Sequence, residues 1–218
     1  AGMFLSRIRD EARLLGLLQD GAIIKVMDLI EVKGRQAVLM EYVEGADLES
    51  IVEQQGPPPP RALAEIGAVV AGALSRAHLA VHPTTEEPLN VIHRDVKPQN
   101  VLLSSKGVAK LADFGISSRL RDQRGEKLVA GTPEYSPPEQ LSGAACDVRA
   151  DVYAAGIMFH QILVGGFPSG LLLFLSGAGA ASLWCAYLHC APNLQLPEAN
   201  NLQGSFGFVT EGWPPPPP

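Results

Sequence analysis

Two short segments carry side chains that could perform chemistry, and a predicted hairpin brings them together. The first, HRDVKPQN, spans residues 93–100, and the second, DFG, spans residues 113–115. Between them, the runs VLLS and VAKLAD flank a Lys-Gly turn, which predicts two antiparallel strands. Asn100 and Asp113 then lie side by side at the open end of this hairpin. Mg²⁺ prefers oxygen ligands and keeps water or phosphate oxygens in its other positions, so this amide and carboxylate indicate a site for a magnesium-bound nucleotide.

Two further polar residues, Asp95 and Lys97, lie just before the same hairpin. A carboxylate there could accept the proton of an attacking hydroxyl group. An ammonium group two residues further on could neutralise charge on a phosphoryl group during its transfer. Together with the metal site, these residue types favour phosphoryl transfer.

Both segments resemble the catalytic loop and the magnesium-binding triplet of protein kinases, which have the same spacing in that family. The resemblance extends over residues 5 to about 168. It implies that Asp95 orients and deprotonates a substrate hydroxyl group and that Lys97 stabilises the transferring phosphoryl group. It also implies that Asn100 and Asp113 hold magnesium. Either triplet alone would mean little, but their order and spacing favour a kinase.

The resemblance assigns roles to residues elsewhere in the chain. Glu11 matches a helix glutamate that pairs with a strand lysine, while Glu41 and Val43 match the hinge positions whose backbone binds adenine. Leu102 matches the residue beneath the adenine ring. Thr132, together with the lysine of the catalytic loop, is the signature of the serine/threonine class. The implied cofactors are ATP and magnesium, and the implied partner is a protein substrate.

Residues 131–140, GTPEYSPPEQ, resemble the end of the activation segment in that family. Asp151 matches the aspartate that anchors the catalytic loop from the following helix. Arg94 matches an arginine that pairs with a phosphate on the activation loop, yet residues 119–131 contain no Ser, Thr or Tyr. We therefore expect no ordinary activating phosphorylation there. Glu126 or a bound partner could instead order the loop.

The chain also departs from the family. Kinases begin with a glycine-rich turn over the phosphates and a strand lysine, and neither matches anything before Glu11. Residues 169–218 do not resemble the later helices, one of which carries an arginine that pairs with the glutamate matched by Glu139. We expect a chain truncated at both ends or altered in frame, with a divergent tail as the less favoured alternative. Since phosphoryl transfer depends on positioning and electrostatics, we expect little activity from these 218 residues alone.

Hydrophobic periodicity predicts the elements that position these side chains. Apolar residues at three- and four-residue steps predict an amphipathic helix over 4–18, and the runs 23–32 and 36–43 predict a β-hairpin. A buried helix is expected after the prolines at 57–60, with its apolar stripe over 66–77. Another helix is expected over about 151–164, closed by two glycines.

Composition excludes several classes of function. A net charge of −6, with 46% hydrophobic and 18% charged residues, is typical of a globular protein and argues against non-specific binding to nucleic acid or anionic membranes. The three cysteines form neither an even set nor a zinc-ligand pattern, which favours a reducing, cytoplasmic location. No secretory signal pattern is found at the first residues.

The last fifty residues are different in character. The stretch 171–188 is uncharged and reaches the lower length limit of a membrane-spanning helix, but serine and glycine dilute it and no basic residues flank it. A poorly ordered apolar segment is the favoured interpretation, and a membrane span is the alternative. The chain ends in five prolines, which favour an extended conformation.

The predicted fold is α+β and protein-kinase-like with two lobes. Residues 3–42 are expected to be a remnant of the small lobe, residues 46–168 most of the helical large lobe, and residues 169–218 an unassigned tail. The predicted function is ATP-dependent phosphorylation of protein Ser or Thr. A non-catalytic, pseudokinase-like interaction module is the main alternative: the unmatched lysine and glycine-rich loop favour it, and the intact acidic and amide residues oppose it. A membrane-anchored receptor kinase is the third interpretation.

Overall fold

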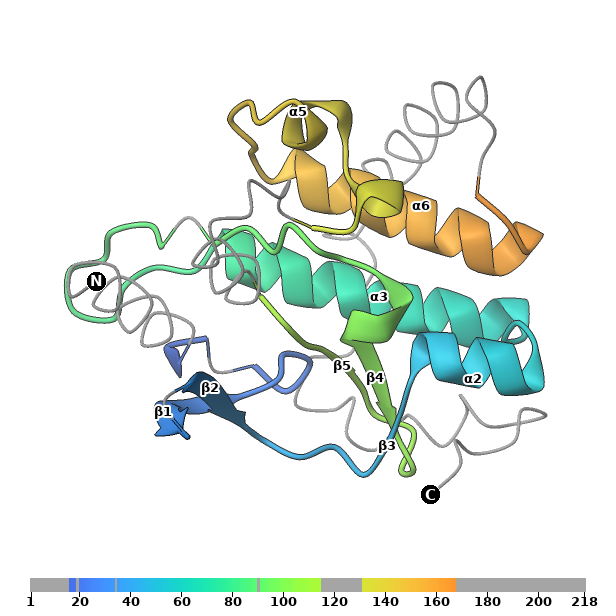
Figure 1. Cartoon of the computed structure of the whole chain (residues 1–218), viewed down its shortest axis with the longest axis horizontal. Coiled ribbons are helices and arrows are strands. Elements are labelled where there is room, and N and C mark those ends of the chain that lie inside the picture. The colour runs from blue at the N-terminus through green and yellow to red at the C-terminus, as the bar shows by residue number, and fades with distance from the viewer. Residues whose placement is uncertain (1–15, 19, 34, 90, 115–130, 168–218) are drawn as a thin grey trace.

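The computed structural model describes residues 16–18, 20–33, 35–89, 91–114 and 131–167 (Figure 1). Most of the helix predicted over 4–18 lies outside these residues, as do Glu11, Glu126 and the apolar stretch 171–188.

The first sheet is a two-stranded antiparallel hairpin of β1 (Val26–Val32) and β2 (Arg35–Met40). Leu29 pairs with Val38, and the register shifts between Val26 and Asp28. The predicted hairpin is therefore confirmed, but its first strand begins three residues later than the apolar run that starts at Ile23.

The first residues of that apolar run, before β1, pair instead with Leu111, which belongs to the second sheet described below. The backbone N–H of Ile24 donates to the carbonyl of Leu111 (2.9 Å), and the N–H of Leu111 donates to the carbonyl of Ala22 (2.8 Å). Ile23 and Ile24 are both buried. An exposed two-stranded hairpin buries little on either face, so two consecutive isoleucines gain more by lying against the larger core.

The second sheet has three antiparallel strands in the order β3 (Gly45–Asp47), β4 (Val101–Ser104) and β5 (Ala109–Leu111). The predicted hairpin of β4 and β5 is confirmed, with Leu102 opposite Lys110. The sequence did not predict β3. A side chain at Gly45 would collide with the backbone at Leu103 of β4, so only glycine allows this close pairing.

In the described residues, four α-helices and two 3₁₀ turns follow or separate these strands. Asp47 caps α2 (Leu48–Gln55) by accepting the N–H of Ser50 at 2.9 Å. The long helix is α3, and α6 is the helix expected over about 151–164, which ends at Gly165 as predicted. Their bounds, with those of the short elements, are α3 (Pro60–His78), α5 (Pro138–Leu141), α6 (Arg149–Val164), and the 3₁₀ turns η1 (Pro98–Asn100) and η2 (Pro133–Tyr135).

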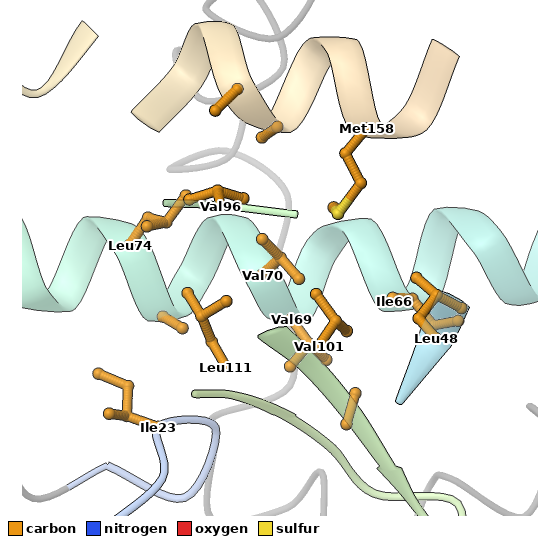
Figure 2. Close-up of a cluster of buried hydrophobic side chains, with 14 of the residues drawn as sticks. Ile23, Leu48, Ile66, Val69, Val70, Leu74, Val96, Val101, Leu111 and Met158 are labelled. Atoms are coloured by element: carbon orange, nitrogen blue, oxygen red, sulfur yellow. The ribbon is translucent and has the colours of Figure 1, made fainter. Parts of the chain in front are cut away.

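The core lies around α3, which packs between β5 and α6 (Figure 1). Figure 2 shows apolar side chains converging on this helix from the second sheet, from α2 and from α6. Fully burying one such side chain contributes about 1.5–3 kcal/mol, so α3 is the main support of the hairpin that carries the site. The fully buried apolar residues include Leu48, Ile51, Ile66, Val96, Val101, Leu111 and Met158.

Among the helices of the described ranges, none combines the length and the apolar character that crossing a membrane requires. The stretch 171–188 lies outside those ranges.

Candidate active site

Asp95 lies at the centre of the site, in the loop between α3 and β4. Its carboxylate is only 7% exposed. One oxygen, Oδ2, lies 2.9 Å from the ammonium nitrogen of Lys97, and Oδ1 accepts a hydrogen bond from the hydroxyl of Thr132 at 3.0 Å. Lys97 also donates to that hydroxyl at 2.8 Å. The structure thus joins Thr132, which is 35 residues from Lys97 in sequence, to both side chains of the predicted catalytic loop.

The protonation state of Asp95 follows from these contacts. Burial alone raises the pKa of a carboxylic acid, but the ammonium of Lys97 and the hydroxyl of Thr132 more than offset this effect. The net result is that the pKa of Asp95 lies below its ordinary value. The carboxylate is therefore ionised at neutral pH and able to accept a proton.

Asn100 is buried and fastened to the same aspartate. Its amide nitrogen donates to the backbone carbonyl of Asp95 at 2.7 Å, so the amide oxygen remains as the atom that can bind a cation. The N–H of Ala112 donates to the carbonyl of Asn100 at 2.8 Å, which places the exposed Asp113 one residue beyond the pairing. Asp113 has φ +61°, a left-handed conformation that aspartate tolerates.

An amide oxygen and an exposed carboxylate at one end of a hairpin form a donor set that suits Mg²⁺. Within the described ranges, no three His, Cys, Asp or Glu side chains converge in a way that could hold a metal ion. A cation held by Asn100 and Asp113 would take water and phosphate oxygens in its other positions, which is the coordination that Mg²⁺ favours.

Asp151 of α6 binds the backbone of the loop that carries Asp95. This carboxylate is 0% exposed and accepts hydrogen bonds from the N–H of Arg94 (2.7 Å) and the N–H of His93 (2.9 Å). The Nε2 atom of His78, in the last turn of α3, lies 2.7 Å from the same carboxylate. The predicted anchoring contact of Asp151 is present, and His78 extends it to α3.

His93 fixes the peptide that precedes Asp95 and Asp113. Its Nε2 lies 2.8 Å from the carbonyl of Ala112, and the N–H of Asp95 lies 3.3 Å from its Nδ1. These two contacts require the neutral tautomer with the proton on Nε2. Burial lowers the pKa of His93, which agrees with a neutral ring, and Phe114 packs against that ring at 4.5 Å between centroids.

The linker between the two sheets carries Glu41 and Val43. The N–H of Glu41 donates to the carbonyl of Lys25 at 3.0 Å, and the Glu41 side chain accepts the N–H of Lys25 at 2.7 Å. Lys110 of β5 binds both carboxylate oxygens of Glu41, at 2.8 and 2.9 Å. In the described part of the chain, neither the Glu41 carbonyl nor the Val43 backbone takes part in a backbone–backbone hydrogen bond.

Leu102 lies close to this linker. It stands opposite Lys110 in the hairpin, so the two side chains share one face of the sheet, and Lys110 reaches Glu41 from that face. Burial raises the pKa of Glu41, but Lys110 and the N–H of Lys25 lower that pKa by a larger amount. The pKa of Glu41 therefore lies below its ordinary value. Lys110 is thus a neighbour of Leu102 in the hairpin and the partner of Glu41, two residues that the sequence assigned to one nucleotide site.

Three functional contacts were missed by sequence reasoning. His78, Lys110 and Gln140 each bind a predicted site residue, but their partners are 46 to 73 positions away along the chain. A histidine in the last turn of a helix and a lysine in a strand have no local signal that separates them from solvated surface groups. Glu11, which was predicted to belong to the site, lies outside the described residues.

Comparison with known proteins agrees with this geometry. The protein kinase domain family matches residues 3–171. The serine/threonine-protein kinase PknH of Mycobacterium bovis is 39% identical over 169 residues, which cover 76% of this chain and 27% of that protein. The serine/threonine-protein kinase PknL of Mycobacterium tuberculosis is 35% identical over 167 residues, which cover 76% of this chain and 40% of that protein.

A solved structure gives the same result for the fold. The crystal structure of the Mycobacterium tuberculosis PknI kinase domain matches with a TM-score of 0.58 and 32% identity, covering 77% of this chain and 58% of that one. The chain therefore belongs to the protein kinase domain family and has a protein-kinase-like α+β fold. It spans between about a quarter and two fifths of the length of the two curated relatives above.

Proposed function

We propose that the protein transfers the γ-phosphoryl group of ATP to serine or threonine hydroxyl groups of a protein substrate. The observation that carries this proposal is the arrangement around Asp95. One ionised, buried carboxylate is bound by the ammonium of Lys97 and the hydroxyl of Thr132, and the magnesium-type ligand Asn100 is fastened to the same residue.

In the proposed reaction, the oxygen of a substrate hydroxyl group forms a bond to the γ-phosphorus, and the bond from that phosphorus to the bridging oxygen of ADP breaks. Asp95 accepts the proton of the hydroxyl group. Lys97 remains beside the reacting groups as a fixed positive charge, so it stabilises the charge on the phosphoryl oxygens without moving. Thr132 holds both side chains in register.

Asn100 and Asp113 would hold magnesium, which neutralises charge on the phosphates when it is bound. The carbonyl of Glu41 and the backbone of Val43 would bind adenine, with Leu102 beneath the ring. Glu11 completes the proposed site, as the partner of a lysine that positions the phosphates.

The proposal extends to the organisation of the chain. Residues 3–42 belong to a small lobe and residues 46–168 to a large lobe, with 169–218 unassigned. We place the protein in the cytoplasm, on the basis of its cysteine content, and expect no nucleic acid as a partner. A membrane is the less favoured partner, through the stretch 171–188.

The test uses the 218 residues fused behind the glycine-rich strands and strand lysine of a family member. The fused protein is incubated with labelled ATP, magnesium and a generic basic protein, and compared with its Asp95→Asn variant. We expect phosphoserine or phosphothreonine that disappears in the variant. Equal incorporation by both proteins would overturn the proposal and favour a non-catalytic interaction module.

A further inference from the structure

Gln140 is a buried polar residue for which the proposed reaction has no role. It lies in α5, directly after the Pro-Pro-Glu sequence, and is only 6% exposed. Its amide nitrogen donates to the backbone carbonyl of Arg94 at 2.8 Å and lies 3.3 Å from the hydroxyl oxygen of Ser136. Ser136 in turn donates to the carbonyl of Thr132 at 2.9 Å.

The acceptor of this hydrogen bond is a strained residue. Arg94 has φ +65°, a left-handed conformation that costs a residue with a side chain about 1–2 kcal/mol. Its N–H is held by Asp151 and its carbonyl by Gln140. Two buried side chains from different helices therefore fix both peptide groups that flank this position, and a strained conformation persists only when its surroundings fix it in this way.

Gly131 shows how closely the same amide is packed. A Cβ atom at Gly131 would collide with the amide nitrogen of Gln140 and would lie 2.7 Å from the carbonyl of Arg94. The Gln140 amide thus fills the space between two backbone segments that are 37 residues apart in sequence. The next residue on each segment is a member of the site, and these two, Asp95 and Thr132, are joined by the 3.0 Å hydrogen bond.

We propose that Gln140 is a positioning residue for Asp95. By binding the carbonyl of Arg94 and packing against Gly131, its amide sets where the carboxylate of Asp95 lies relative to Thr132. This inference deepens the proposed function and depends on it for its catalytic meaning. The contact is uncharged and lies within the described part of the chain, while residues 119–131 offer no hydroxyl group for phosphorylation. The amide therefore fixes the loop without a phosphate.

The deciding variant is Gln140→Met, which keeps the length of the side chain and removes the donor. The matched control is Gln161→Met in α6. Gln161 accepts a hydrogen bond from Tyr135, whose pKa burial raises to about 12. The control therefore also removes one partly buried hydrogen bond, but one in which none of residues 93–100 takes part.

Amide hydrogen exchange is measured by NMR on the 218-residue chain. Losing one hydrogen bond of about 1 kcal/mol should speed exchange at the Arg94 and Asp95 amides about fivefold to tenfold in Gln140→Met. Gln161→Met should leave the exchange rates of these two amides unchanged. It should lower the melting temperature about as much as Gln140→Met does. Equal exchange at both amides in the two variants would overturn the inference. Gly131→Ala, which displaces the same amide, provides a second route to the same result if Gln140→Met does not fold.

Kinetics on the fused protein separate this inference from the proposed function. Among the described residues, the Gln140 amide hydrogen-bonds to Arg94 and Ser136, neither of which is a proposed adenine or metal residue, so Gln140→Met should lower kcat and leave the KM for ATP unchanged. A raised KM with an unchanged kcat would contradict a positioning role. If the fused protein transfers no more phosphate than its Asp95→Asn variant, the proposed function fails. The hydrogen-exchange measurement still decides whether Gln140 holds the loop.

Discussion

The bond between Lys110 and Glu41 gives the sharpest test of how the linker is fixed. In Lys110→Met, the carboxylate of Glu41 loses a bidentate partner but keeps the N–H of Lys25. The side chains are 20% and 30% exposed, so the pair is partly shielded from water. Exposed pairs contribute about 0.2–1 kcal/mol, and hydrogen bonds to charged groups contribute about 1.5–3 kcal/mol. We expect Lys110→Met to lower the free energy of unfolding by about 1–2 kcal/mol.

For a chain of this size, 1 kcal/mol changes the melting temperature by about 2–4 °C, so the expected decrease is about 2–8 °C. The measurement is urea and thermal unfolding at pH 7. The matched control is Lys106→Met, which removes an exposed lysine from the turn between β4 and β5. Equal destabilisation by both variants would refute the reasoning, as would a double-mutant cycle with Glu41→Gln that gives no coupling energy.

The pH dependence has a definite sign. The folded pKa of Glu41 lies below its ordinary value of 4.5, so the contribution of this group to stability is complete above that value. It is lost as the pH falls through the folded pKa. The difference in stability between the unmutated chain and Lys110→Met should therefore be constant from pH 7 to about pH 5 and should narrow below 4.5.

Four further predictions concern the site. Asp95→Asn in the fused protein should lower phosphate transfer about 10²–10⁴-fold with nucleotide affinity retained, whereas Asp113→Ala should weaken magnesium–ATP binding itself; equal losses of affinity in calorimetry would show that the roles are misassigned. Asp151→Leu should lower the free energy of unfolding by about 3–5 kcal/mol, because it leaves buried donors without an acceptor; a loss below about 1 kcal/mol in urea titration would contradict this. Phosphosite mapping of an active fused protein should find no activating phosphate in 119–131, and one on Ser117 or Ser118 would count against this view of regulation. A polypeptide of only these 218 residues should show little or no transfer, and incorporation that Asp95→Asn abolishes would disprove this.

Where periodicity was strong, the sequence predicted the structure. The Lys-Gly turn between two apolar runs predicted the β4–β5 hairpin, and it placed Asn100 at the open end next to the residue before Asp113, where the N–H of Ala112 donates to the carbonyl of Asn100. The apolar stripe over 66–77 predicted that α3 is buried, and most of that stripe lies in the core. These features could be predicted because neighbours in sequence are also neighbours in space.

Other features depend on partners far along the chain. The strand state of Gly45–Asp47 comes from pairing with β4, and three residues are too few for a periodic pattern. Ile23 was assigned to the wrong sheet because an apolar run does not reveal which of two surfaces will bury it. Gln140 binds a backbone carbonyl, and the sequence of the acceptor segment gives no indication that its carbonyl is unpaired with other backbone.

Two segments connect the first sheet to the rest of the chain, one before β1 and one after β2, and both are bonded to β5. This limits how the two sheets can move relative to each other. The segment that enters the first sheet is bonded to Leu111 through its backbone, and the segment that leaves it is bonded to Lys110 through Glu41. A rigid rotation of β1 and β2 against the rest of the chain must therefore pivot about these two adjacent residues. Asp113 follows two positions later, so it lies close to the pivot, where a given rotation produces the smallest displacement. In such a rotation the far end of the hairpin would be displaced most, and the backbone next to Asp113 least.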